Sequence, residues 1–155
     1  MKNSLQLLKV LHGELDACSK YLNIQKEKTD ALVIGDIKKL DLIVRDEQSF
    51  VMKMESFENK RDHILMDSEL NNVTISEIIA SYVEDDLKQQ YQEVFDKLYF
   101  VTEDLKRLNA LNQRLLKQRL SVVNTILRGS NNTQVITNFD DNDSTKFNKD
   151  NLNRA

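Results

Sequence analysis

The sequence predicts an all-α protein: an antiparallel helical bundle with coiled-coil character, one long C-terminal helix and a short helix in the connection before it. Proline is absent and glycine occurs only at Gly13, Gly35 and Gly129, so little interrupts helices. Apolar residues recur at steps of three and four along three long segments. With 155 residues, 40% of them hydrophobic and 30% charged, the chain has the size and composition of one soluble domain.

The first helix is predicted from about Ser4 to Ile34, because one apolar stripe runs along this segment. The stripe consists of Leu5, Leu8, Leu11, Leu15, Cys18 and Leu22. Gly35 and Asp36 follow as a glycine stop and an aspartate N-cap, the pairing expected where one helix ends and the next begins almost at once. The sequence therefore predicts a tight helical hairpin at this point.

The second helix is predicted to end near Met66, and residues one heptad apart mark its inner face. These residues are Ile43, Phe50, Phe57 and Ile64. The same face is expected to be widened by Ile37, Leu40, Val44, Val51, Met54 and Leu65. Large rings on the inner face of a helix usually fill the interior of a bundle, so Phe50 and Phe57 are expected to be core residues.

The connection after the second helix is polar, and Thr74 and Glu77 then have the spacing of a capping box. A short helix over residues 78–83 is expected there. The third long helix is predicted from about Val83 to Arg128. It begins with the acidic run Glu84–Asp86 and has Gly129 as a C-terminal stop. At about 1.5 Å per residue it is roughly 70 Å long, against roughly 45 Å for each earlier helix, so one end must overhang.

The stripe along this long helix alternates steps of four and three. Its members are Leu87, Tyr91, Val94, Leu98, Val101, Leu105, Leu108, Asn112, Leu115, Arg119, Val122 and Ile126. Residues 1–129 are thus expected to form one helical bundle. Residues 130–155 are rich in Asn, Asp, Ser and Thr without a period, which predicts a disordered polar tail. A regulatory or gate-contacting tail is the alternative to a passive, solvated one.

Composition argues against several classes of function. The net charge is −3 and basic residues are interleaved with acidic ones, so nucleic acid is not an expected ligand. The single cysteine, Cys18, cannot form an intrachain disulfide or a Cys cluster for zinc. It fits a reducing compartment and lies on the apolar stripe of the first helix, where core packing is expected. No stretch is long and apolar enough for membrane insertion, and we expect a cytoplasmic protein.

Catalysis finds no support in the motifs, so we expect no enzyme and no cofactor. There is no glycine-rich phosphate loop and no nucleophile elbow. His12 and His63 each have an aspartate four residues on, Asp16 and Asp67, which suggests a metal site. A hairpin that turns at Gly35 offsets the two histidines by about five residues, roughly 7–8 Å along the axis, so ordinary surface histidines are the favoured interpretation.

The second half of the long helix carries a second apolar stripe beside the first. It consists of Leu111, Leu116, Leu120, Val123 and Leu127. One hairpin covers one stripe, so these side chains need another contact. Either the short helix, the tail or the second subunit of a homodimer covers them, or they form a groove for a partner helix.

Two segments resemble the FlgN family of flagellar export chaperones. In KEKTDALVIGDIKKLDLIVRDEQSFVMKM, the residues that match the family pattern between its first two helices are Lys28, Ala31, Leu32, Gly35, Asp36 and Leu40. LKRLNALNQRLLKQRLSVVNTILRG is similar to the final helix of the family, with its leucine pairs and the glycine at Gly129. The similarity covers roughly residues 5–130, and the tail beyond Gly129 departs from the family pattern.

This resemblance implies a cytosolic chaperone for the hook-filament junction proteins FlgK and FlgL, which delivers them to the flagellar export apparatus. The late stripe would cover the C-terminal helix of the cargo, and amides such as Asn112 would tune the register. The candidate cargo-binding residues are Leu111, Asn112, Leu115, Leu116, Arg119, Leu120, Val123 and Leu127. The alternative is a structural coiled-coil protein that forms homo-oligomers without cargo, and a metal-dependent helical enzyme is a distant third.

Overall fold

The computed structural model describes residues 1–129 and confirms the all-α class. Its helices are α1 (Ser4–Ile34), α2 (Ile37–Asp67), α3 (Ile75–Ser81) and α4 (Asp85–Gly129). The short helix α3 begins three residues earlier than residue 78, where the sequence predicted it. Gly129 is the last described residue, so the prediction for residues 130–155 lies outside the described chain.

The turn between α1 and α2 has the predicted chemistry. Gly35 adopts a left-handed conformation with φ of 81°, and the backbone N–H groups of Gly35 and Asp36 both donate to the carbonyl oxygen of Ala31, at 2.8 and 3.0 Å. This geometry ends α1 and favours glycine. The Asp36 carboxylate then accepts a hydrogen bond from the Lys39 backbone N–H at 3.1 Å, which caps α2.

The capping box at α3 is also confirmed. Thr74 Oγ1 accepts a hydrogen bond from the Glu77 N–H at 3.3 Å, and Glu77 Oε2 accepts one from the Thr74 N–H at 3.0 Å. The backbone N–H and the hydroxyl of Thr74 both donate to the Glu77 carboxylate at 3.0 Å, and these two hydrogen bonds lower the pKa of Glu77. Apolar side chains of α3 then pack into the core beside α4, so the short helix closes the end of the bundle where α1 begins.

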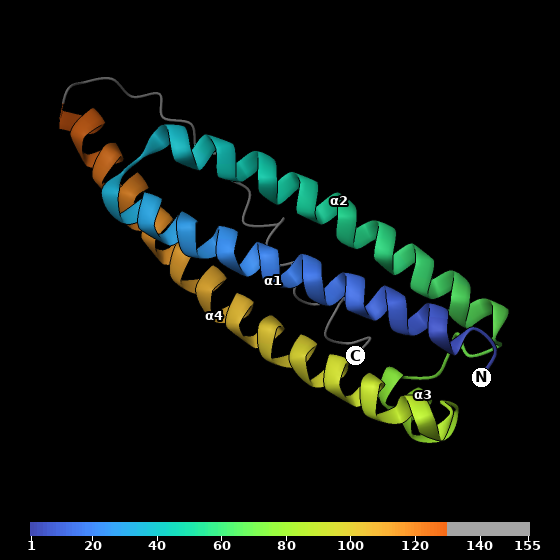
Figure 1. Ribbon diagram of the computed structural model, residues 1–155. Helices are drawn as coiled ribbons and strands as arrows, with labels where there is room; N and C mark the ends of the chain where they lie inside the picture. The colour runs from blue at the N-terminus through green and yellow to red at the C-terminus, as the bar shows by residue number, and fades with distance from the viewer. Residues whose placement is uncertain (130–155) are drawn as a thin grey trace.

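Helix α1 is the central element of the fold. It packs against both α2 and α4, and Figure 1 shows it between them. Two faces of α1 are therefore buried rather than the single predicted stripe. Leu7 and Val10, outside that stripe, are buried, whereas Leu5, within it, is 60% exposed.

The inner face of α2 is narrower than predicted. Ile43, Phe50, Met54 and Leu65 are buried, and Phe57 and Ile64 are half-buried. The expected widening by Ile37, Val44 and Val51 is wrong, because these side chains are 79%, 41% and 48% exposed. Only α1 lies against α2 over most of its length, and one neighbouring helix covers only one face.

The apolar core consists of two clusters. One joins the start of α1 to the end of α2, to α3 and to the start of α4, and it includes Leu7, Ile78 and Tyr91. The other lies nearer the middle of α1 and includes Cys18, Phe50 and Leu105. Leu105 is the last apolar residue of α4 that is fully buried. Beyond Leu105, the polar side chains of Asn112 and Arg119 form hydrogen bonds between α4 and α1.

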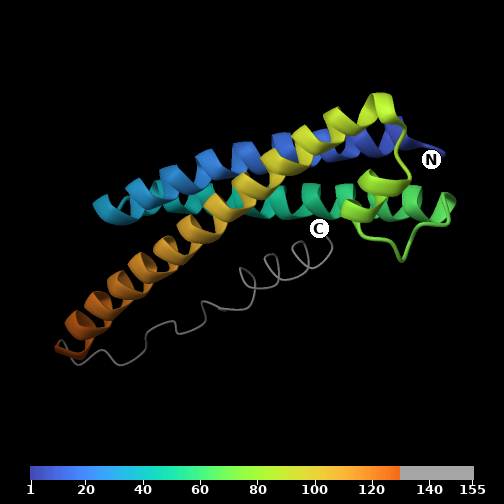
Figure 2. The same cartoon turned by 90° about the horizontal axis from the view of Figure 1, so that it is seen from below.

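Helix α4 crosses α1 and extends away from the hairpin, as Figure 2 shows. Its 45 residues exceed the 31 residues of α1 and of α2, which confirms the predicted overhang. None of the helices in residues 1–129 has the length and apolarity that crossing a membrane requires.

Candidate functional site

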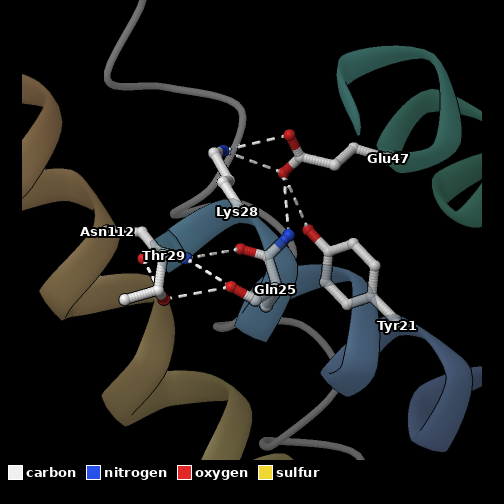
Figure 3. A network of polar contacts seen from close by, with 6 residues as sticks. All are labelled: Tyr21, Gln25, Lys28, Thr29, Glu47 and Asn112. Atoms are coloured by element: carbon white, nitrogen blue, oxygen red, sulfur yellow. Dashed lines mark hydrogen bonds and ion pairs between the residues drawn. The ribbon is translucent and has the colours of Figure 1, made fainter. Parts of the chain in front are cut away.

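A buried polar network joins the second half of α4 to α1. Asn112 is 2% exposed, and its Nδ2 donates to the backbone carbonyl oxygen of Gln25 at 3.1 Å and to Gln25 Oε1 at 3.2 Å. Thr29 Oγ1 donates to Asn112 Oδ1 at 2.6 Å (Figure 3). Both ends of the Asn112 amide are thus satisfied within the chain.

The same network continues from α1 to α2 through Gln25. Gln25 Nε2 donates to Glu47 Oε2 at 3.0 Å, and Glu47 also pairs with Lys28 Nζ at 3.0 Å. The Tyr21 hydroxyl donates to the same carboxylate at 3.2 Å. Burial, together with the nearby charge of Glu47, raises the pKa of Tyr21. Gln25 therefore connects all three long helices (Figure 3).

Arg119 joins α4 to the end of α1 through two hydrogen bonds. Its Nε donates to the carbonyl oxygen of Leu32 at 2.9 Å, and its Nη2 donates to the carbonyl oxygen of Val33. These carbonyls lie in the final turn of α1, where no intrahelical donor is available. A positive charge is also favourable at the C-terminus of a helix. Arg119 thus caps α1 with a side chain from α4.

Beyond Arg119, α4 extends past the end of α1, so the side of α4 that faces α1 up to this point has no more of α1 opposite it. Val122, Val123 and Ile126 lie three, four and seven residues after Arg119 and so on the same side of the helix. They are 57%, 45% and 65% exposed. We call Val122, Val123 and Ile126, with the adjacent half-buried Leu116, Leu120 and Leu127, the overhang surface.

The structure separates the sequence-predicted candidates into two groups. Asn112 and Arg119 are engaged with α1. The other six candidates have apolar side chains. Val123 is the most exposed of these six, and the other five are half-buried: Leu111, Leu115, Leu116, Leu120 and Leu127. Sequence reasoning missed Val122 and Ile126, which it assigned to the bundle stripe. The unequal helix lengths were the signal that could have identified them.

The hairpin tip presents further apolar side chains close to the point where Arg119 contacts α1. Val33, Ile34 and Ile37 are 60%, 77% and 79% exposed. The Arg119 guanidinium also lies next to Gly35, since a Cβ added there would be 3.6 Å from Arg119 Nη1. The overhang surface and the hairpin tip thus meet at Arg119.

The other titratable candidates are structural or exposed. Cys18 is buried, as predicted, and desolvation together with the charge of Glu14 raises the pKa of its thiol to about 12. Glu14 forms a buried ion pair with Arg61, at 2.9 Å between Oε1 and Nη1. His12 and His63 are exposed. In residues 1–129, no three His, Cys, Asp or Glu side chains converge in an arrangement that could hold a metal ion.

Comparisons with known proteins identify the family of this chain. A family model described as FlgN protein matches residues 1–138. The chain is also 31% identical over 123 residues to the uncharacterized protein YvyG of Bacillus subtilis (strain 168), an alignment that covers 77% of this chain and 71% of that protein. No solved structure matches. With the family match spanning most of its length, the chain belongs to the FlgN family of chaperones in flagellar assembly.

Proposed function

We propose that this protein binds the amphipathic C-terminal helices of the hook-filament junction proteins FlgK and FlgL in the cytoplasm. It keeps these helices from assembling early and delivers their proteins to the flagellar type III export apparatus. Family membership supports the chaperone role. The observation that carries the binding site is the overhang surface, an apolar continuation of α4 beyond the end of its own neighbour α1.

An amphipathic helix is the partner whose shape and chemistry fit this surface. Val122, Val123 and Ile126 follow helical spacing, and a cargo helix laid against them would continue the packing that α1 provides up to Arg119. Full burial of a Val or Ile side chain contributes about 1.5–3 kcal/mol. Burial of the exposed parts of these three side chains supplies part of the driving force that offsets the cost of association.

The proposal gives the eight sequence candidates different roles. Val123 and the leucines at positions 111, 115, 116, 120 and 127 are the candidate cargo contacts. Asn112 and Arg119 are positioning residues, because their hydrogen bonds to α1 set the angle at which α4 leaves the hairpin.

The test is a pair of charge substitutions, Val122→Glu and Ile126→Glu, assayed by calorimetry against the C-terminal helical segments of FlgK and FlgL. An unpaired carboxylate in a desolvated interface costs several kcal/mol, whereas it costs little on a surface open to water. Each variant should melt like the wild-type protein and lose cargo binding. Phe100→Glu is the matched control, since Phe100 is 67% exposed on the same helix and lies outside the overhang surface.

Two outcomes would contradict the proposal. If Ile126→Glu folds and binds cargo as well as Phe100→Glu does, the binding surface lies elsewhere. If sedimentation shows a stable homodimer that both substitutions dissociate, and no junction protein competes with it, the overhang surface serves self-association instead.

A further inference from the structure

The charges of α4 are divided between its two halves. From Asp85 to Asp104 most charged residues are acidic, whereas from Leu105 to Gly129 every charged residue is basic. The basic residues are Lys106, Arg107, Arg114, Lys117, Arg119 and Arg128. The chain as a whole has a net charge of −3, so the second half of α4 is a local exception to the interleaving of charges elsewhere.

Several of these cations interact within the chain. Lys106 pairs with Glu103 at 3.2 Å, Arg107 pairs with Asp104, and Arg119 caps α1. Arg114, Lys117 and Arg128 are exposed, and Lys117 also interacts within the chain. At about 100° per residue, all three lie within about 40° of the direction opposite to Asn112, which faces α1. We call Arg114, Lys117 and Arg128 the cationic face.

The cationic face and the overhang surface are on opposite sides of the same helix. The main packing partners of α4 in residues 1–129 are α1 and α3, and α1 lies on the side of Asn112 and Arg119. A helix bound to the overhang surface therefore leaves Arg114 and Arg128 open to solvent.

We propose that the cationic face is a second docking surface, which binds an acidic protein surface while cargo occupies the opposite side of α4. The simultaneous binding of cargo and of an acidic protein rests on the proposed function, but the recognition of carboxylates by these cations does not. Two of the three cations are arginines, whose planar guanidinium groups match carboxylate groups in paired hydrogen bonds. Over residues 105–129 no acidic residue accompanies the basic ones in the sequence.

The number and position of the cations favour a protein over other anionic partners. Nucleic acid binding at physiological salt needs more phosphate contacts than three cations supply. A helix that lies on an anionic membrane keeps its apolar side in the bilayer, and its cations flank that side. Here the cations lie opposite the apolar side, so the two cannot contact one membrane surface together.

The test uses the full chain and a fluorescein-labelled Glu-Ala peptide several helical turns long, with anisotropy measured at low and at physiological ionic strength. The variant Arg114→Gln/Arg128→Gln should bind the peptide about tenfold more weakly, since each exposed charge pair contributes a factor of roughly two to five. The matched control is Lys26→Gln/Lys38→Gln, which removes the same charge from exposed lysines of the hairpin. It should bind the peptide like the wild-type protein.

A reciprocal pair of measurements separates this inference from the cargo site. Val122→Ser/Ile126→Ser should lose binding of the junction-protein helix and keep binding of the Glu-Ala peptide. Arg114→Gln/Arg128→Gln should keep binding of the junction-protein helix and bind the Glu-Ala peptide more weakly. If both double variants lose both ligands, α4 has one surface and the inference is wrong. Equal peptide binding by the arginine variant and the lysine control would also overturn it.

Three other occupants are outcomes of the same experiment. If phosphatidylserine-containing vesicles or duplex DNA bind more tightly than the peptide and lose binding in the arginine variant, the partner is not a protein. If the peptide binds only after Asp140, Asp141 and Asp143 are replaced by Asn, the chain's own acidic segment is the ligand and the intermolecular assignment is wrong.

Discussion

Arg119 Nε donates a hydrogen bond to the carbonyl oxygen of Leu32 at 2.9 Å, across 87 positions of sequence. This contact joins the last turn of α1 to α4, close to the point where α1 ends at Ile34. It satisfies a carbonyl that would otherwise lack a helical donor. Together with the buried Asn112, Arg119 therefore helps to set the direction of the overhang surface relative to the hairpin.

Replacing Arg119 should loosen this end of the molecule more than it destabilises the whole. Arg119→Met removes both hydrogen bonds to α1, and we expect a loss of about 0.5–1.5 kcal/mol of unfolding free energy. Amide hydrogen exchange in residues 120–129 should become faster. Arg114→Met, on the opposite side of α4, should leave exchange unchanged. Equal exchange in the two variants would show that Arg119 does not hold the overhang.

The Asn112 amide should be costly to remove, because Gln25 is buried with it and Thr29 is half-buried. Asn112→Ala leaves Gln25 Oε1 without its Asn112 donor and Thr29 Oγ1 without its Asn112 acceptor, which should cost about 1–3 kcal/mol. Urea denaturation measures this loss. In a double-mutant cycle with Thr29→Val, the two losses should be clearly less than additive. Additive losses would mean that the Thr29–Asn112 hydrogen bond contributes nothing to stability.

The Glu14–Arg61 ion pair should matter through its desolvation. Glu14→Ala leaves the Arg61 charge buried and unpaired, with an expected loss of about 3–5 kcal/mol. Glu14→Met/Arg61→Met removes both charges, so thermal unfolding should show it to be more stable than Glu14→Ala alone. A double variant as unstable as the single one would show that packing, and not charge, is lost.

The same pair predicts the sign of a pH dependence. Burial raises the pKa of Glu14 and outweighs the attraction of Arg61, so the native state holds the proton to higher pH than the unfolded state does. The stability that Glu14 contributes is present below its ordinary pKa and is lost as the pH rises through the raised native value. The unfolding free energy of wild type minus that of Glu14→Gln should therefore fall over this range. A difference that rises with pH would mean that Arg61 dominates.

Phe50 should contribute more to stability than Phe57, although the two rings lie one heptad apart. Phe50 is 7% exposed and stacks on Tyr21, with ring centroids 3.9 Å apart. Phe50→Ala should cost about 3–5 kcal/mol. Phe57 is half-buried against Gly13, and Phe57→Ala should cost about 1–3 kcal/mol. Denaturant titration of the two variants measures the order, and the reverse order would place the α1–α2 interface wrongly.

The reactivity of the Cys18 thiol should report local unfolding of the core, so no added label is needed. Cys18 is the one cysteine of the chain, it is 5% exposed, and its pKa of about 12 keeps the thiolate scarce at neutral pH. Reaction with a disulfide reagent should be slow in the native protein. In Phe50→Ala it should accelerate about tenfold for every ~1.4 kcal/mol of lost stability. Fast reaction in the wild-type protein would show that this part of the core opens easily.

The sequence alone determined the local features of the fold. Gly35 and Asp36 mark the hairpin and Thr74 and Glu77 mark α3, because turn and cap chemistry involves residues within a few positions of each other. Helical periodicity likewise located α4, since it depends on spacing within one segment.

Only the tertiary structure decided which helix covers each apolar side and where that cover ends. A stripe shows that one side of a helix is apolar, but it does not identify the neighbour. Leu7 is therefore buried while Leu5 is exposed, because α1 has two neighbours. Asn112 and Arg119 bind α1 through partners 87 positions away, and Ile126 is exposed because α1 ends at Ile34. Such contacts depend on how long helices cross, which no local pattern of residues encodes.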